Sequence, residues 1–378
     1  MKSAVITGFV RSPFTLAGKG ALARVRPDDL AAQVIRGLIG KTGVAPADIE
    51  DVILGCAFPE GEQGLNVARL VALLADLPLS VGGMTVNRFC GSSMSAVHIA
   101  MGQIAVGAGE VFVCAGVESM SRVPMMGFNP LPNPVLAKKS AAYMSMGETA
   151  ENVARQYKIP RAEQEALAVT SQQRAAAAQA DGRFAGEIVA IAGKAGTVDR
   201  DGTIRGETTA EALGALKPAF DAAGTVTAGT SSPLTDGASA VLVTSEDYAK
   251  AHGLPVLARI KAVAISGCAP EVMGLGPIVA SRKALARAGL AVGDLDVVEL
   301  NEAFASQALA CIGELGLDRE RTNIDGGAIA LGHPLGATGA RIVGKAAQLL
   351  KRGGGRYALA TQCIGGGQGI ATVLEAVE

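Results

Sequence analysis

The chain has 378 residues, 49% of them hydrophobic, so it can form a large core and fold as two or more packed units. The net charge is −1 without a basic stripe, and six cysteines are scattered without paired spacing. These features argue against nucleic-acid binding and a disulfide framework, and they favour a reduced, cytoplasmic enzyme.

Strand-like and helical segments alternate along the first third of the chain. Residues 4–9 are an apolar run typical of a buried strand, and residues 27–43 follow with apolar side chains on one helical face. Three more predicted strands and two more predicted helices lie at 51–55, 84–87, 111–117, 66–78 and 90–109. The alternation predicts an α/β layered fold with strands buried on both faces.

Residues 118–146 interrupt this rhythm with four prolines and five methionines. A stretch of this composition predicts a long excursion, and long loops are often functional. Helices are expected at about 147–157 and 162–180, and turn and strand return within 217–245.

The second half of the chain echoes the first. GVAPADIEDVIL at 43–54 is similar to GLAVGDLDVVEL at 289–300, and each segment leads from a helix through a turn into an apolar strand. The echo predicts two similar packed halves. The N-terminal half would comprise 1–117 and about 186–250, an inserted loop and helical region 118–185, and the C-terminal half 251–378.

Cys90 is the first candidate for chemistry, because it falls where a predicted strand meets a predicted helix. The positive end of the helix dipole and free N–H groups at such a turn are expected to lower the pKa of the thiol and favour thiolate. The alternative interpretation is a buried structural cysteine.

His333 is the second candidate. Pro334 keeps its backbone away from the helical region, so the sequence predicts that His333 projects from a strand-to-helix turn. Surrounding glycines leave the imidazole uncrowded, whereas His98 within a helix and His252 at a helix end fit the alternative of an ordinary core or surface histidine.

Asn301 and Cys363 complete the candidate set. Asn301 follows a predicted strand, where it could also be the N-cap of a helix beginning near Ala303. Cys363 precedes a run of glycines that lacks the GxxxxGK[ST] pattern of a phosphate-binding loop. Two cysteines, a histidine and an amide suit a reaction that combines acyl transfer with proton movement on carbon.

Four blocks give the chain a resemblance to the thiolase family over nearly its whole length: VNRFCGSSMSA, NEAFA, GGAIALGHPLGATGAR and CIGGGQG. The resemblance implies a five-layer αβαβα fold with two similar halves and an inserted loop region. Within the family, CGSSM, IRGETT, TAGTSSPLTDGA and GQGIATV resemble the degradative 3-ketoacyl-CoA thiolases of fatty-acid β-oxidation.

The resemblance also implies a role for each catalytic candidate. Cys90 becomes acylated, His333 activates first Cys90 and later the incoming CoA thiol, and Cys363 protonates the enolate of acetyl-CoA. Asn301 holds a water that, with His333, stabilises this enolate. The backbone N–H groups of Cys90 and Gly365 form the second oxyanion site.

Substrate contacts are implied in the same way. Arg205 matches the family's contact near the nucleotide of CoA, and Ser232 matches its contact near the pantetheine. Four residues are expected to line the acyl end: Met146, Met273, Ala303 and Phe304.

No cofactor or metal is expected, and CoA and acyl-CoA are substrates. With three histidines and no CxxC spacing, the chain offers little for zinc. We expect a homodimer or homotetramer, with the dimer favoured by the short excursion at 118–146. A hydratase/dehydrogenase partner of a fatty-acid oxidation complex remains open. Neither a signal peptide nor an apolar run of membrane-spanning length is expected.

Two other functions stay open on the sequence. One is a biosynthetic acetoacetyl-CoA thiolase (acetyl-CoA C-acetyltransferase), which runs the same chemistry as condensation. The other is a thiolase-like protein that only binds acyl-CoA or lipid, and the three intact residues Cys90, His333 and Cys363 argue against it. Biosynthetic relatives carry a histidine directly before the pocket methionine, where this chain has Ser145, so longer acyl chains are expected to be accepted.

Overall fold

The computed structural model describes residues 2–194 and 196–377, and its centre is a ten-stranded sheet. The strands of this sheet are β1 (Ala4–Arg11), β2 (Thr15–Leu16), β3 (Asp51–Gly55), β4 (Gly82–Val86), β5 (Val111–Ser119), β8 (Thr235–Ser245), β9 (Ala258–Gly267), β10 (Val297–Leu300), β11 (Tyr357–Ile364) and β12 (Gln368–Glu375). A separate two-stranded sheet pairs β6 (Ile191–Gly193) with β7 (Gly196–Val198).

The helices surround and divide this sheet. They are α1 (Pro27–Thr42), α2 (Val67–Leu74), α3 (Ser92–Val106), α4 (Pro134–Lys139), α5 (Met146–Gln156), α6 (Arg161–Ala180), α7 (Ala210–Gly214), α8 (Glu246–Ala251), α9 (Gly276–Ala288), α10 (Ala305–Leu315), α11 (Ala328–Leu331) and α12 (Leu335–Gly353).

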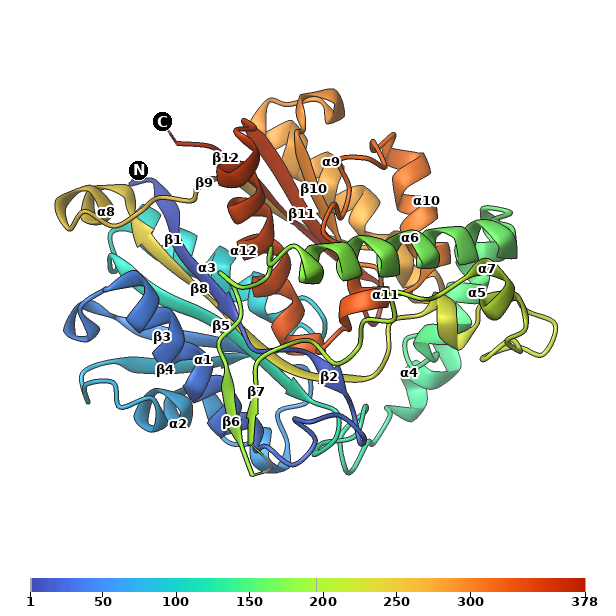
Figure 1. The fold of residues 1–378 in the computed structure, drawn as a ribbon, viewed down its shortest axis with the longest axis horizontal. Coiled ribbons are helices and arrows are strands. Elements are labelled where there is room, and N and C mark those ends of the chain that lie inside the picture. Colours follow the sequence, from blue (N-terminus) through green and yellow to red (C-terminus); the bar gives the residue numbers. More distant parts are fainter. Residues whose placement is uncertain (1, 195, 378) are drawn as a thin grey trace.

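The sheet consists of two parts. The strand order is β4-β3-β5-β8-β1 in one part and β9-β12-β11-β10 in the other, and only two residue pairs between β1 and β9 join them. Helices α3 and α12 pack together between the two parts, with α1 and α2 outside one part and α9 and α10 outside the other (Figure 1). The predicted five-layer αβαβα fold is therefore confirmed.

The echoed segments have matching local structures. Helix α1 ends at Gly43 (φ 70°) and α9 ends at Gly289 (φ 68°), and both glycines adopt the left-handed conformation that a helix C-terminus favours. A single 3₁₀ turn then leads into a buried strand, Pro46–Asp48 before β3 and Val292–Asp294 before β10. The predicted repeat thus corresponds to one helix–turn–strand unit in each half.

The halves differ just before their inner helices. In the first half, β4 pairs in parallel with β3 and leads to Cys90 and α3. In the second half, only an isolated bridge between Val298 and Thr322 occupies the corresponding place, and the short helix α11 follows. The predicted strand-to-helix turn at His333 is therefore wrong: His333 lies between two helices.

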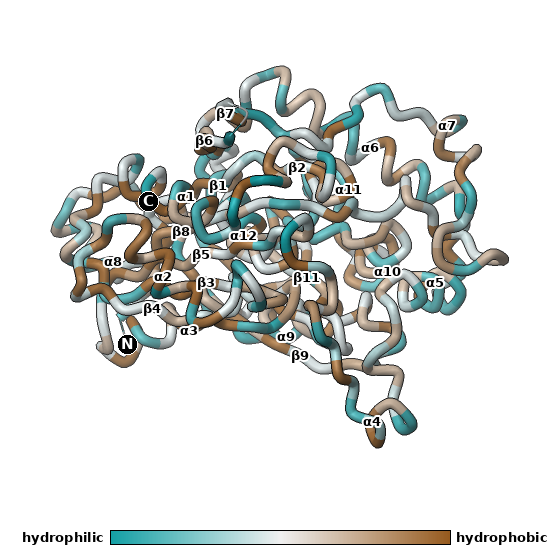
Figure 2. Tube along the Cα trace, turned by 90° about the horizontal axis from the view of Figure 1, so that it is seen from below, coloured by the Kyte–Doolittle hydropathy of each residue, from teal (hydrophilic) through white to brown (hydrophobic). Residues whose placement is uncertain are grey.

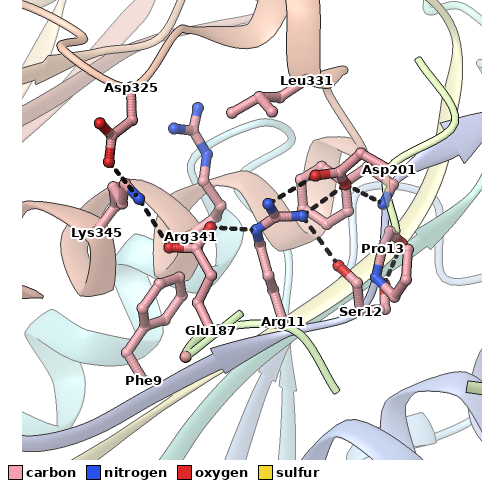
Figure 3. Close-up of polar contacts among 12 residues, drawn as sticks. Phe9, Arg11, Ser12, Pro13, Glu187, Asp201, Asp325, Leu331, Arg341 and Lys345 are labelled. Atoms are coloured by element: carbon pink, nitrogen blue, oxygen red, sulfur yellow. Dashed lines mark hydrogen bonds and ion pairs between the residues drawn. The ribbon is translucent and has the colours of Figure 1, made fainter. Parts of the chain in front are cut away.

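Buried charges hold α12 against the rest of the molecule (Figure 3). Glu187 lies between Arg11 of β1 and Lys345 of α12, with a 2.8 Å contact to each. Lys345 also contacts Asp325 at 2.9 Å, and Arg11 pairs with Asp201 at 2.7 Å. Because every charge in this group has an opposite partner, removal of one would leave another buried and unpaired, which destabilises a fold strongly.

Between β5 and β8 the chain leaves the main sheet and forms α4 to α7 and the small β6–β7 sheet. Helix α4 extends away from the body of the molecule (Figure 2). The helices predicted near 147–157 and 162–180 are present as α5 and α6. The predicted domain division at 118–185 stays a prediction.

One stretch departs from the expectation about membrane spans. Residues Phe89–Val106 are long and apolar enough to cross a membrane by length and composition, and more than half of this stretch is buried inside the molecule. Helix α3 packs against α12, β3 and β5, so its position between the two parts of the sheet accounts for its apolar composition.

Candidate active site

Cys90 occupies the turn between β4 and α3. The preceding Phe89 has φ 43°, an uncommon value for a residue with a side chain, and Gly91 is the N-cap of α3. A Cβ atom on Gly91 would lie 2.5 Å from the end of the Ile364 side chain, so any larger residue here would require Ile364 to move. Gln362 adds a hydrogen bond from its side-chain amide to the carbonyl oxygen of Cys90.

The protonation state of Cys90 differs from the sequence-based prediction. Burial raises the pKa of its thiol to about 11, although hydrogen bonds from the N–H groups of Gly365 and Cys90 act in the opposite direction. The prediction of a lowered pKa is therefore wrong, because the loss of solvation exceeds the effect of the helix terminus. Both N–H groups therefore act on the Cys90 side chain, and the oxyanion site expected from them stays a prediction.

His333 is held at its backbone and at its ring. Its backbone N–H donates to Thr235 Oγ1 at 3.1 Å, and its Nδ1 lies 2.7 Å from Thr338 Oγ1. The Thr338 hydroxyl donates its only hydrogen to the carbonyl oxygen of Pro334 at 3.0 Å, so it can only accept from Nδ1. The proton therefore resides on Nδ1, and Nε2 carries the free electron pair.

Burial, reinforced by the positive charge of Arg341, lowers the pKa of His333 to about 3. The imidazole is consequently neutral near pH 7. Together with the raised pKa of Cys90, this means that Cys90 rests as a thiol and His333 as a neutral imidazole, which is the form a general base requires.

Asn301 is fully buried directly after β10. Its Nδ2 lies 3.4 Å from His333 Nε2, too far for a strong hydrogen bond, and its Oδ1 has no partner among the described residues. The alternative of a helix cap is wrong, because α10 begins at Ala305 with Phe304 in the N-cap position. Asn301 thus places its Nδ2 beside the His333 ring and keeps its buried Oδ1 without a partner among the described residues.

Cys363 lies at the end of β11 with no exposed surface. Burial raises the pKa of its thiol well above the ordinary value, and the nearby Cys90 acts in the same direction. Gly365–Gly367 connect β11 to β12, and Gly366 (φ 80°) and Gly367 (φ 85°) adopt left-handed conformations that suit glycine. Cys363 is therefore a protonated thiol at the edge of a tight hairpin.

An apolar cluster adjoins Cys363 and contains all four residues predicted for the acyl end. Met273, Ala303 and Phe304 are buried in it, with Met146 half-buried against them. Ser232 belongs to the same neighbourhood, since its N–H and hydroxyl donate to the carbonyl oxygen of Ala303 at 3.0 and 3.1 Å. Arg205 lies on an exposed segment, with its backbone N–H held by Gln172.

Several contributors to the site escaped the sequence analysis. Thr235 and Gln362 support the catalytic residues through contacts between distant parts of the chain, whereas Thr338 lies within the same block as His333. Ser145 did carry a signal, because S-x-x-E before an apolar face is a capping box. The Ser145 hydroxyl accepts from the N–H of Glu148 at 3.3 Å and caps α5, which begins with Met146. Among the described residues, no group of three or more acidic, histidine or cysteine side chains could hold a metal ion.

The chain matches known proteins along nearly its whole length. Residues 4–247 match the model of the thiolase N-terminal domain, and residues 254–376 match that of the thiolase C-terminal domain. The chain is 46% identical over 389 residues to a 3-ketoacyl-CoA thiolase of Bacillus subtilis, covering 99% of this chain and 100% of the relative. It is 50% identical over 391 residues to a 3-ketoacyl-CoA thiolase of Shewanella denitrificans, covering both chains completely.

Solved structures give the same result. The crystal structure of human mitochondrial 3-ketoacyl-CoA thiolase in complex with CoA has a TM-score of 0.92 and 38% identity, covering 100% of this chain and 98% of that chain.

Proposed function

The chain belongs to the thiolase family of acyltransferases, and we propose that it uses free CoA to cleave 3-ketoacyl-CoA into acetyl-CoA and a shortened acyl-CoA. One observation carries the proposal. The carbonyl oxygen of Cys90 accepts a hydrogen bond from Gln362, the residue before the buried thiol Cys363, and Cys363 belongs to an apolar cluster.

The first step is attack by Cys90. As its sulfur bonds to the 3-keto carbon, His333 Nε2 takes the thiol proton, and the carbonyl oxygen becomes an alkoxide. The N–H groups of Cys90 and Gly365 donate to this oxygen. Loss of one such donor typically reduces the rate on the order of 10²-fold or more.

In the second step the alkoxide collapses and the Cα–Cβ bond breaks. The acyl group stays on Cys90, and the electron pair passes to the enolate of acetyl-CoA. Protonated His333 and a water held by Asn301 stabilise the enolate oxygen, and Cys363 donates its proton to the carbon. The raised pKa of Cys363 suits this role, because the group must be protonated beforehand.

The third step returns the enzyme to its starting state. The proton on His333 passes to the Cys363 thiolate, so that both groups are reset. His333 then takes the proton of the incoming CoA thiol, whose sulfur attacks the acyl group, and the departing Cys90 sulfur receives that proton. Product leaves before CoA reacts, so the kinetics should be ping-pong.

The substrate is proposed to extend from Arg205 at the nucleotide, past Ser232 at the pantetheine, to the apolar cluster. The flexible thioether side chains of Met146 and Met273 can adapt to acyl groups of different length. The relatives described above are named 3-ketoacyl-CoA thiolases, which supports a degradative role in fatty-acid β-oxidation.

We further propose a cytoplasmic homodimer. Strand β4 is an edge strand of the sheet, and the nearby Leu65 and Leu79 are 88% and 80% exposed. An unpaired edge beside exposed leucines suits association with a second copy. Association with a hydratase/dehydrogenase is a further proposal that this arrangement does not address.

The test is a thiolysis assay that follows the enolate absorbance of acetoacetyl-CoA with and without free CoA. If the proposed function is correct, the absorbance falls only when CoA is present, and acetyl-CoA is released. Neither change should occur in Cys90→Ala. Cys114→Ala is the matched control, because it removes a buried thiol from β5, outside the proposed site. Stable binding of acetoacetyl-CoA without turnover would instead indicate a binding protein.

A further inference from the structure

Glu118 is a buried carboxylate that the mechanism above does not use. It lies near the end of β5, is 1% exposed, and accepts hydrogen bonds from four N–H groups. A fully buried carboxylate with this many donors is expensive to desolvate, so its contacts indicate what it holds in place.

The four donors come from different halves of the fold. Oε2 accepts from the N–H of Ala57, after β3, at 2.8 Å and from the N–H of Gly336, in the first turn of α12, at 2.9 Å. Oε1 accepts from the N–H of Phe58 at 3.2 Å and from the side chain of Gln63 at 2.9 Å. One oxygen therefore bridges the first half directly to the helix that follows His333.

The segment after β3 that Glu118 holds also supports the turn that carries Cys90. The Asn87 side chain donates to the carbonyl oxygen of Ala57 at 3.0 Å, and the rings of Phe58 and Phe89 lie 5.8 Å apart. Glu118 is thus connected to the residue directly before Cys90 by one short path.

On its other side Glu118 meets α12 at very close range. A Cβ atom on Gly336 would lie 2.6 Å from the carbonyl oxygen of Val117 and 2.8 Å from the Cα of Cys56. Gly336 stands three residues after His333, so the carboxylate fixes the start of α12 at a close approach of the two halves.

We propose that Glu118 is a positioning residue of the reaction, whose carboxylate keeps the His333-bearing start of α12 in register with the Cys90-bearing turn. The inference rests on the proposed thiolase function. Glu118 does not touch the reacting atoms, so it should affect turnover more than substrate affinity.

The charge of Glu118 supplies a readout that a purely structural role would not move. Its negative charge acts with burial to raise the pKa of the Cys90 thiol, and it acts in the same way on the thiol of Cys56. The titratable groups whose pKa the Glu118 charge raises are thus Cys56, just after β3, and Cys90, after β4. From α12, Glu118 receives the hydrogen bond of the Gly336 N–H. Loss of the charge should shift the reactivity of Cys90 toward lower pH.

The test compares three variants of the whole chain. Glu118→Gln keeps the size but removes the charge, and its NH₂ group cannot accept the hydrogen bonds that one carboxylate oxygen receives. Glu118→Asp keeps the charge but is shorter by one carbon–carbon bond of about 1.5 Å. Asp296→Asn is the control, because Asp296 also accepts from two backbone N–H groups, those of Arg356 and Tyr357, but at the opposite end of β10 from Asn301.

For each variant, kcat and KM of thiolysis are measured with acetoacetyl-CoA and CoA, and the rate of Cys90 alkylation by iodoacetamide is measured against pH. Glu118→Gln should lower kcat about 10- to 100-fold, as misplacement of about 1 Å does elsewhere, with KM changed less than about threefold. Its alkylation midpoint should fall, because the negative charge that raises the pKa of Cys90 is gone. Glu118→Asp should lower kcat while the midpoint stays near that of the unmodified protein, and Asp296→Asn should change neither.

A folded Glu118→Gln protein with unchanged kcat, or with an unmoved alkylation midpoint, would overturn the proposal. If that variant does not fold, Glu118→Asp carries the test, and an unchanged kcat there would be equally contrary. The alkylation profile does not depend on turnover. A moved profile in a protein without thiolase activity would therefore show failure of the proposed function rather than of the influence of Glu118 on Cys90.

Discussion

Thr338→Val removes the acceptor that fixes the tautomer of His333 while keeping nearly the same side-chain shape. Thr338 is fully buried, and its hydroxyl lies 2.7 Å from His333 Nδ1. Without it, either the Nδ1 proton is left without an acceptor or the proton moves to Nε2, where it blocks the base. An unsatisfied buried donor costs about 1–3 kcal/mol, so kcat should fall about 5- to 150-fold.

Initial rates of acetoacetyl-CoA thiolysis at saturating CoA measure this effect. KM for CoA should change little, because Thr338 lies on the side of the ring opposite Nε2. Thr338→Ser is the matched control, since it keeps the hydroxyl and should stay within about threefold of the unmodified enzyme. Wild-type kcat in folded Thr338→Val, or equal losses in both variants, would refute the assignment of the tautomer.

Three further predictions follow from the same geometry. Cys363→Ala should retain acyl exchange between acetyl-CoA and Cys90 but lose carbon–carbon cleavage by roughly 10²- to 10⁴-fold, and equal losses of both activities would argue against separate roles. In thiolysis of 3-ketoacyl-CoA with four, six and eight carbons, kcat/KM should hold or rise, because each buried methylene contributes about 0.8 kcal/mol; a tenfold fall from four to six carbons would favour the biosynthetic alternative. Burial lowers the pKa of His98 to about 3, whereas a histidine in the unfolded chain has a pKa of about 6.5. Between these two pH values the unfolded state therefore carries a proton that the folded state does not bind. In His98→Gln the unfolding free energy should therefore fall less steeply as the pH drops through this range, by up to about 1.4 kcal/mol per pH unit. Urea titrations at several pH values measure this, and an unchanged dependence on pH would contradict the lowered pKa of His98.

Much of the architecture was predictable because its signals are local. Apolar periodicity located the main amphipathic helices, and the echoed segments end helices at Gly43 and Gly289 in the same way. The secondary structure before His333 could not be predicted from such local signals. The second half keeps only a single bridge at Thr322 where the first half has a strand, and no residue pattern distinguishes the two outcomes.

The identity of the catalytic residues was easier to predict than their protonation states. Cys90 and His333 stand out by their neighbours along the chain, whereas their pKa values depend on how deeply the two halves bury them. A helix N-terminus alone lowers the pKa of a thiol, but at Cys90 the loss of solvation raises it by more. Supporting residues such as Thr235 and Glu118 depend on tertiary contacts, so sequence reasoning had no means of selecting them.

The central claim is that Cys90 carries the acyl group, and intact-protein mass spectrometry tests it most directly. The protein is mixed with acetoacetyl-CoA in the absence of free CoA, and the mass is recorded before and after CoA is added. The account predicts one added acetyl group per chain, located on Cys90 by peptide mapping, which disappears on addition of CoA and never forms in Cys90→Ala. An adduct that persists in Cys90→Ala, or active enzyme that forms none, would contradict it.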